Sequence, residues 1–194
     1  MNSDVVVATE SDRHRLLSLL LVSYTQCPYV RWMMPSADDY FKHATTYFSG
    51  ALKSAIDDGT AFRTKDFGGI ALLHSPQEIY KGALDPVIHR KIAPKEIMKD
   101  ADGLHRMCVE RWPKEHVWYY STLACDPTLR GRGYAIELSQ KRNEVVDQSG
   151  LPAYLEATNE TAASIHERYG GFERLPEIQF GSSPVLQPMY RAAR

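Results

Sequence analysis

The feature that most constrains the fold is a strand, a glycine-containing turn, a helix and a second strand that follow one another in the second half of the chain. Residues 117–125 are β-branched and aromatic, which predicts a strand. A helix is expected over residues 131–149, stopped by Gly150, and residues 153–157 predict the next strand. This βαβ order is typical of an α/β protein with a partly parallel sheet.

The remaining segments alternate in the same way, without a linker, repeat or low-complexity tract. A turn-like stretch is expected around Pro28 and Pro35, and a hairpin connection at residues 65–68. We therefore expect one domain over residues 1–194. The other predicted elements are strands at residues 5–8, 60–64, 69–74, 172–178 and 184–191, and helices around residues 16–21, 38–55 and 161–169.

Residues 75–114 interrupt this alternation with several prolines, and only residues 92–111 show helical periodicity. We interpret the segment as helical with loops. Binding groups tend to lie on long connections above a rigid scaffold, so we expect this segment on the substrate side of the molecule.

Composition excludes several classes of protein. The chain has 23 basic and 24 acidic residues and a net charge of -1, so no overall field favours nucleic acid. Cys27, Cys108 and Cys125 have unrelated spacings, and the seven histidines are scattered, so we expect reduced thiols and no metal. The apolar run at residues 16–22 is too short to span a membrane, and no secretory signal is recognisable at the N-terminus. A cytoplasmic protein without membrane partners is expected.

The connection between the predicted strand and helix has a composition suited to anions. Glycines at 131 and 133 allow a tight turn and close approach of a ligand, and the following helix presents unpaired N–H groups. Arg130 and Arg132 add positive charge. The segment fits a pyrophosphate, although a plain connecting turn is equally consistent with it. Neither a P-loop nor the three-glycine dinucleotide pattern is present.

These residues resemble a known family. Arg130-Gly131-Arg132-Gly133-Tyr134-Ala135 is similar to the motif with which GNAT-superfamily N-acetyltransferases hold the pyrophosphate of acetyl-CoA. The flanking segments, residues 118–127, 151–159 and 166–172, resemble that family's fourth strand, fifth strand and following helix end. Residues 32–35, Trp-Met-Met-Pro, resemble the branch that contains puromycin N-acetyltransferase. The resemblance implies a mixed sheet of about six or seven strands with helices on both faces.

The resemblance also implies roles for individual residues in coenzyme binding. The backbone N–H of Leu123 matches the donor to the acetyl oxygen, and Cys125 matches the next contact to pantetheine. Asn159 would flank the pantetheine arm, although it is also a good helix cap. The pyrophosphate-binding residues implied are Arg130, Gly131, Arg132, Gly133, Tyr134 and Ala135.

Proton transfer is where this sequence departs from the family. The usual acid is a tyrosine ten residues after the strand glutamate, and here that position is His166. The chain also has one extra glycine before Phe172. His166 and Tyr169, about one helical turn apart, are both candidates for the acid. Glu156 is a candidate base if burial raises its pKa, and a strand carboxylate satisfied by backbone donors is the alternative.

For the acceptor, Trp118, Tyr119 and Tyr120 are candidates to line an amine pocket, since aromatic faces attract cations. A strand alternates its sides, so at least one of these aromatic residues is expected to serve packing instead. Trp32, with Pro35, is a candidate to close over the substrate, and a buried tryptophan anchor is the alternative. The function we expect is acetyl transfer to a primary amine of a small molecule by direct attack in a ternary complex, in a monomer or homodimer. The alternatives are a protein or peptide N-acetyltransferase and a coenzyme-binding sensor without activity.

Overall fold

The computed structural model describes residues 4–76 and 91–194, and within them the chain forms one seven-stranded mixed sheet. The strand order is β1-β2-β3-β4-β5-β7-β6. Only β4 and β5 are parallel, and every other neighbouring pair is antiparallel. The strands are β1 (Val5–Val7), β2 (Ala61–Thr64), β3 (Gly69–His74), β4 (Trp118–Cys125), β5 (Ala153–Ala157), β6 (Glu173–Arg174) and β7 (Gln187–Arg191).

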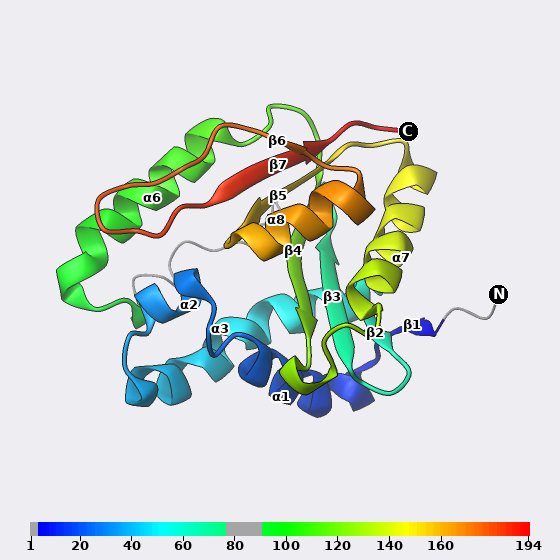
Figure 1. The fold of residues 1–194 in the computed structure, drawn as a ribbon, viewed down its shortest axis with the longest axis horizontal. Coiled ribbons are helices and arrows are strands. Elements are labelled where there is room, and N and C mark those ends of the chain that lie inside the picture. The colour runs from blue at the N-terminus through cyan, green and yellow to red at the C-terminus, as the bar shows by residue number, and fades with distance from the viewer. Residues whose placement is uncertain (1–3, 77–90) are drawn as a thin grey trace.

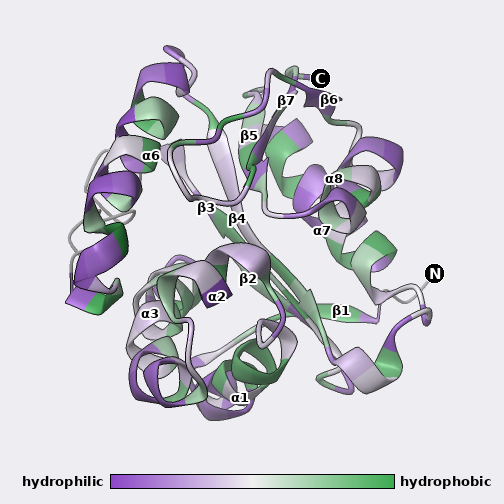
Figure 2. Ribbon diagram, turned by 60° about the vertical axis from the view of Figure 1, so that its left-hand side comes forward, coloured by the Kyte–Doolittle hydropathy of each residue, from purple (hydrophilic) through white to green (hydrophobic). Residues whose placement is uncertain are grey.

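Helices cover both faces of this sheet, as expected (Figure 2). One face carries α1–α3, with α6 beside them, and the other carries α7 and α8. The helices are α1 (Arg13–Ser23), α2 (Pro28–Met33), α3 (Ala37–Asp57), α6 (Met98–Arg111), α7 (Tyr134–Ser149) and α8 (Glu160–Ile165). Short 3₁₀ turns are η1 (Glu10–Asp12), η2 (Lys95–Ile97) and η3 (Pro127–Leu129), and a π-helical turn is η4 (His166–Gly170). None of the described helices is both long and apolar enough to cross a membrane.

The spacing of apolar residues explains why the helices pack as they do. In α3, Tyr40, Ala44, Phe48 and Leu52 recur every four residues and are all buried against the sheet. Each large apolar side chain buried in this way contributes roughly 1.5–3 kcal/mol. Ser36 caps the start of α3, where its side chain accepts a hydrogen bond from the Asp39 N–H at 3.0 Å.

Several sequence-based boundaries needed correction. The stretch around Pro28 is a helix, α2, because proline at its first position suits a helix start. Residues 172–178 and 184–191 pair over the short strands β6 and β7 and at an isolated bridge between Ile178 and Leu186. The last helix ends in the π-helical turn η4, and this turn accommodates the extra glycine before Phe172. Of the expected substrate-side segment, η2 and α6 are described, and residues 77–90 lie outside the described part of the chain.

The sheet opens between β4 and β5. The parallel ladder joins only Trp118 to Ala153 and Tyr119 to Tyr154, so β4 continues beyond its last pair with β5. The β3–β4 register shifts by one residue between its Leu72–Thr122 and His74–Tyr119 pairs, which marks a bulge in β4. Figure 1 shows β5, β7 and β6 turning away from the direction of β3 and β4. The free edge of β4 faces the resulting gap.

Candidate active site

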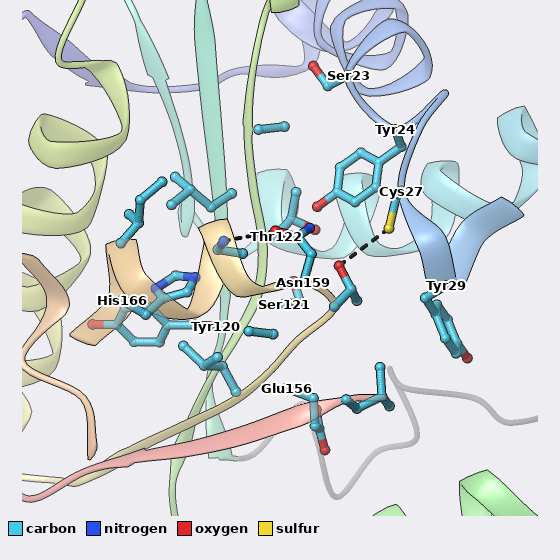
Figure 3. Close-up of a pocket in the computed structure, with 18 of the residues that line it drawn as sticks. Ser23, Tyr24, Cys27, Tyr29, Tyr120, Ser121, Thr122, Glu156, Asn159 and His166 are labelled. Carbon is cyan, nitrogen blue, oxygen red and sulfur yellow. Dashed lines mark hydrogen bonds between the residues drawn. The ribbon is translucent and has the colours of Figure 1, made fainter. Parts of the chain in front are cut away.

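A cavity of about 1690 Å³ occupies this gap. Its walls come from β4 and β5, the turn before α7, the inner side of α8, and parts of α1, α3 and α6. Figure 3 shows Tyr24 and Cys27 on one side of the cavity and His166 and Tyr120 on the other, with Glu156 at the end away from Ser23. Groups that are far apart in the sequence therefore face one space.

One end of the cavity is an anion-binding turn at the start of α7. Gly131 and Gly133 have φ values of +84° and +88°, a backbone region that strains any other residue. A Cβ at either position would meet open space, so both glycines face the cavity without obstruction. The N–H groups of residues 131–135 have no hydrogen-bond partner among the described residues. Together with the exposed Arg130 and Arg132, they form the cradle expected for a pyrophosphate.

A hairpin turn braces this cradle from behind. The Tyr134 hydroxyl donates a hydrogen bond to the Asp66 carboxylate, in the connection between β2 and β3. A Cβ on Gly68 would lie only 2.4 Å from the Tyr134 ring, so the close approach of hairpin and turn requires glycine there. The hairpin predicted at residues 65–68 is confirmed, and it fixes the position of the glycine-containing turn before α7.

The exposed edge of β4 supplies backbone donors along the cavity. The Asp126 N–H donates to the Gly68 carbonyl at 2.9 Å, on the β3 side. Donors alternate between the two sides of an antiparallel strand, so the N–H groups of Leu123 and Cys125 point toward the gap. The backbone of Leu123 opposes the rise in the pKa of Tyr24, which lines the cavity on that side. The two backbone donors expected from the sequence therefore face the cavity.

Asn159 lies on the opposite wall, at the start of α8. Its side-chain oxygen accepts from the Ala162 N–H at 2.9 Å, so it caps the helix, and it also lines the cavity. Beside it, the Thr158 hydroxyl and the Cys27 thiol are 3.3 Å apart (Figure 3). Asn159 thus caps the helix and lines the cavity at once, so its position is compatible with a capping role and with a contact to a ligand.

Glu156 dominates the other end of the cavity. Burial raises the pKa of its carboxyl to about 7, and hydrogen bonding, chiefly from Tyr119, opposes the rise. The Tyr119 hydroxyl donates to Glu156 Oε2 at 2.8 Å. No basic side chain forms an ion pair with Glu156 in the described part of the chain. A carboxyl group that titrates near neutrality can accept a proton from a substrate.

Aromatic side chains surround this carboxyl group. The Trp112 ring lies 5.1 Å from the Tyr119 ring and 4.9 Å from the Tyr154 ring, measured between centroids. We define the aromatic wall as the four rings at this end that line the cavity, Tyr29, Tyr47, Trp112 and Tyr119. Such rings suit the apolar body of an amine and the cation it carries.

The two candidate acids are in different environments. His166 is 5% exposed, and burial together with the charge of Arg142 lowers its pKa to about 3. It is therefore neutral near pH 7. Tyr169 is 38% exposed and lines the same cavity.

Of the aromatic candidates for the acceptor side, Tyr119 and Tyr120 line the cavity, and Trp32 and Trp118 do not. The Tyr120 hydroxyl donates to Asn143 at 2.9 Å. The Trp118 indole donates to Ser149 at 2.9 Å, and the Trp32 indole donates to Ser182 at 3.3 Å. Both tryptophans pack between elements of the fold. For Trp118, this is the packing role that alternation of strand sides predicted for at least one aromatic residue of β4.

Two of the cysteines that line the cavity, Cys108 and Cys125, are poor nucleophiles. Burial raises the pKa of Cys125 to about 11 and that of Cys108 to about 12. All three cysteines are free thiols. In residues 4–76 and 91–194, no cluster of three or more His, Cys, Asp or Glu side chains could hold a metal ion.

Sequence reasoning missed most of the side chains around Glu156. Tyr29 and Tyr47 come from α2 and α3, and Trp112 follows α6, so no short motif joins them. Tyr24 was missed for the same reason. Tyr119 was among the candidates from the sequence, and it lines the cavity from the side of β4 opposite Trp118.

No family model matches the sequence. Several solved structures with a similar fold are described as acetyltransferases. They include a Corynebacterium glutamicum protein described as histone acetyltransferase HPA2 and related acetyltransferase (21% identity, 98% and 96% of the two chains covered, TM-score 0.61). Others are the Drosophila melanogaster polyamine N-acetyltransferase that forms N-acetylagmatine (16%, 97% and 98%, 0.66) and arylalkylamine N-acetyltransferase 2 of Aedes aegypti (13%, 98% and 98%, 0.69).

The fold is thus that of GNAT-type acetyltransferases over almost the whole chain. This confirms the fold expected from the resemblance of residues 118–172. At identities of 13–21%, the similarity to these structures supports the fold of this chain and no further property. The narrower resemblance to the branch of puromycin N-acetyltransferase stays a prediction.

Proposed function

We propose that the protein transfers the acetyl group of acetyl-CoA to a primary amine of a small molecule. The observation that carries this proposal is that the free edge of β4 and the Glu156 carboxyl, which titrates near neutrality, face one cavity. The edge is suited to an extended thioester, and the carboxyl is suited to the proton of an attacking amine.

Acetyl-CoA fits the residues at the first end. The unpaired N–H groups of residues 131–135, with Arg130 and Arg132, would hold its pyrophosphate. The N–H groups of Leu123 and Cys125 would hold the pantetheine arm and the acetyl oxygen, and Asn159 would contact the arm from α8. Acetyl-CoA supplies the activated acyl group as a co-substrate.

The transfer needs no enzyme nucleophile. The amine nitrogen forms a bond to the thioester carbonyl carbon, the carbon–sulfur bond breaks, and sulfur leaves with its electron pair. Glu156 takes the proton that the nitrogen loses, directly or through water. Because burial raises the pKa values of Cys108 and Cys125, direct attack is favoured over an acetylated cysteine.

The departing sulfur must receive a proton. We assign this step to Tyr169, because neutral His166 has no imidazolium proton to give near pH 7. His166 then serves as part of the cavity wall. On this assignment Tyr169→Phe lowers kcat more than His166→Gln does, and the reverse order would return the role to His166.

The cavity also restricts the acceptor. Glu156 is the only carboxylate among its described lining residues, and Lys91 and Lys114 line the same cavity. A peptide segment rich in lysine would meet no acidic groove there. The aromatic wall and single carboxyl favour a small amine with one positive charge and an apolar body, over a protein acceptor.

Thiol release from acetyl-CoA, measured with a panel of small amines, lysine-containing peptides and no acceptor, tests the proposal. We expect release that depends on a small amine, with one N-acetylated product per thiol. Calorimetry with acetyl-CoA is the companion measurement. Binding without release from any acceptor would support the sensor, and release with peptides alone would support the protein acetyltransferase. Absence of binding would overturn the proposal.

A further inference from the structure

Arg142, in α7, is a completely buried cation that no carboxylate neutralises within the described part of the chain. Its exposed fraction is 0%, and its Nη1 donates to the Thr122 carbonyl oxygen at 3.1 Å. Its Nε and Nη2 atoms are buried without a hydrogen-bond partner. The guanidinium carbon lies 4.2 Å from the centre of the Tyr120 ring.

The other fully buried arginine shows what full pairing looks like. Arg191 is 1% exposed, and its two Nη atoms contact the two oxygens of Asp147 at 2.6 and 2.9 Å. Its Nε donates to the Gly170 carbonyl at 3.0 Å. Burying a cation is costly unless such partners compensate, and Arg142 lacks them. Its pKa falls only to about 10, through burial, so it is charged at neutral pH. A structural role alone does not explain this arrangement.

The peptide group that Arg142 contacts joins it to the cavity. The Thr122 carbonyl and the Leu123 N–H belong to the same peptide unit, and they point in opposite directions across a trans bond. The carbonyl receives the guanidinium on the closed side, and the N–H faces the gap. A hydrogen bond to a carbonyl oxygen draws electrons toward it, which makes the N–H of that peptide a stronger donor.

The charge of Arg142 also reaches groups that line the cavity. It is one of the influences that lower the pKa of His166, and it counteracts the rise in the pKa of Tyr24. His166 and Tyr24 lie on opposite sides of the gap (Figure 3). The positive potential of Arg142 therefore extends across the space that the acyl group would occupy.

We propose that Arg142 is a positioning residue that polarises the Thr122–Leu123 peptide and stabilises negative charge at the gap. This inference rests on the proposed acetyl transfer. When the amine forms its bond to the carbonyl carbon, an electron pair moves onto the carbonyl oxygen, and it returns as the carbon–sulfur bond breaks. The added charge on oxygen exists only during the reaction, so Arg142 acts on kcat more than on coenzyme affinity.

Arg142→Met and Arg142→Lys test this role, with Arg191→Met as the matched change at the paired arginine. We expect Arg142→Met to lower kcat roughly 10- to 100-fold, less than loss of a direct donor at the oxyanion would. The dissociation constant of acetyl-CoA should change less than about 2-fold. Arg142→Lys, which can keep the charge, should recover part of kcat. Arg142→Met should melt at the wild-type temperature or above it, because an unpaired buried charge is removed, whereas Arg191→Met should melt lower.

A second readout does not depend on turnover. The ¹³C resonance of the acetyl carbonyl of labelled acetyl-CoA reports polarisation of that carbonyl in the bound state. We expect it to move toward its free position in Arg142→Met. An unchanged resonance and kcat would overturn the role of Arg142 alone. Loss of kcat with a drop in melting temperature like that of Arg191→Met, and an unchanged resonance, would also overturn it. Failure of the wild type to bind acetyl-CoA would instead overturn the proposed function.

Discussion

The two ends of the cavity are built from different kinds of group. The coenzyme end consists of backbone: the N–H groups of residues 131–135 and the free edge of β4, held by glycines with positive φ. The acceptor end consists of side chains, with Glu156 from β5 and the aromatic wall from three helical regions and β4. The first end is local in the sequence, and the second is assembled only by the fold.

This difference separates two tasks. Backbone donors bind any pyrophosphate and pantetheine alike, so the coenzyme end is generic. On the proposed function, a buried carboxyl within aromatic rings would select charge and shape, so the acceptor end would determine which amine reacts. Substitutions at the coenzyme end should therefore change coenzyme affinity, and substitutions at the acceptor end should change turnover and acceptor choice.

The largest effect is expected for Glu156→Gln. Loss of the base should lower kcat by about 10²- to 10³-fold, because the attacking nitrogen then has no nearby group to take its proton. The dissociation constant of acetyl-CoA should stay within about 2-fold, because Glu156 lies at the other end. Steady-state thiol release and calorimetry measure the two quantities.

Glu160→Gln is the matched control. Glu160 is an exposed carboxylate on α8 that pairs with Arg174 at 2.7 Å, outside the cavity lining. Its removal should leave kcat unchanged. If Glu156→Gln weakened coenzyme binding as much as it lowered kcat, the separation of the two ends would be refuted.

The next effect belongs to the coenzyme end, where Gly131→Ala tests the turn. A Cβ at φ +84° strains the backbone, and relaxation of that strain would misdirect the N–H groups around it. We expect acetyl-CoA to bind about 10- to 30-fold more weakly, with a smaller change in kcat at saturating coenzyme.

Gly150→Ala supplies the comparison, because Gly150 ends the same helix with φ +66° and its Cβ also meets open space. Both variants should lose roughly 1 kcal/mol of stability through strain at positive φ. Only Gly131→Ala should lose coenzyme affinity. Equal affinity of the two variants for acetyl-CoA would show that the turn does not bind the coenzyme.

The same contrast explains how far the sequence could predict this molecule. The coenzyme end was predictable because a turn, its glycines and the strand before it are contiguous, and the resemblance to the family indicated Leu123 and Cys125 as the backbone donors of that strand. Glu156 was predictable as a residue, but its raised pKa depends on burial beneath Tyr119 and its neighbours. No local pattern encodes such burial.

Other features depended on contacts between distant segments. Trp32 and Trp118 have the residue type of pocket walls, and the fold turns both toward packing partners, Ser182 and Ser149. Arg142 looks like any surface arginine of an amphipathic helix until α7 is packed against β4. A charged residue in a helical sequence is therefore poor evidence that its side chain is exposed to solvent once the helix is packed.

A smaller effect concerns the charge of the acceptor. A second ammonium or guanidinium group would find no second carboxylate among the described lining residues and would approach Lys91 or Lys114. We expect kcat/KM for agmatine or putrescine to be at least about 10-fold below that for a monoamine of similar length with an apolar body. Competition between the two acceptors, followed by mass spectrometry of the products, measures this ratio. A preference for the dication would contradict this prediction and would mean that a second anionic group contacts the acceptor.

The smallest effect concerns the pH dependence of turnover. Glu156 must be ionised to accept a proton, so kcat at saturating amine should be low below the pKa of about 7 and should rise to a plateau above it. The hydrogen bond from Tyr119 stabilises the ionised form and lowers this pKa. Tyr119→Phe should therefore shift the rise to higher pH by about half to one unit.

At pH 7 this shift lowers kcat about 2- to 5-fold, and near pH 9 the variant should approach the wild-type plateau. Tyr120→Phe is the control, because its hydroxyl donates to Asn143 and leaves Glu156 untouched. If Tyr119→Phe lowered kcat equally at every pH, its hydroxyl would position the acceptor instead of tuning the base. The Tyr119 hydroxyl would then resemble the backbone donors of the coenzyme end, which bind at fixed positions.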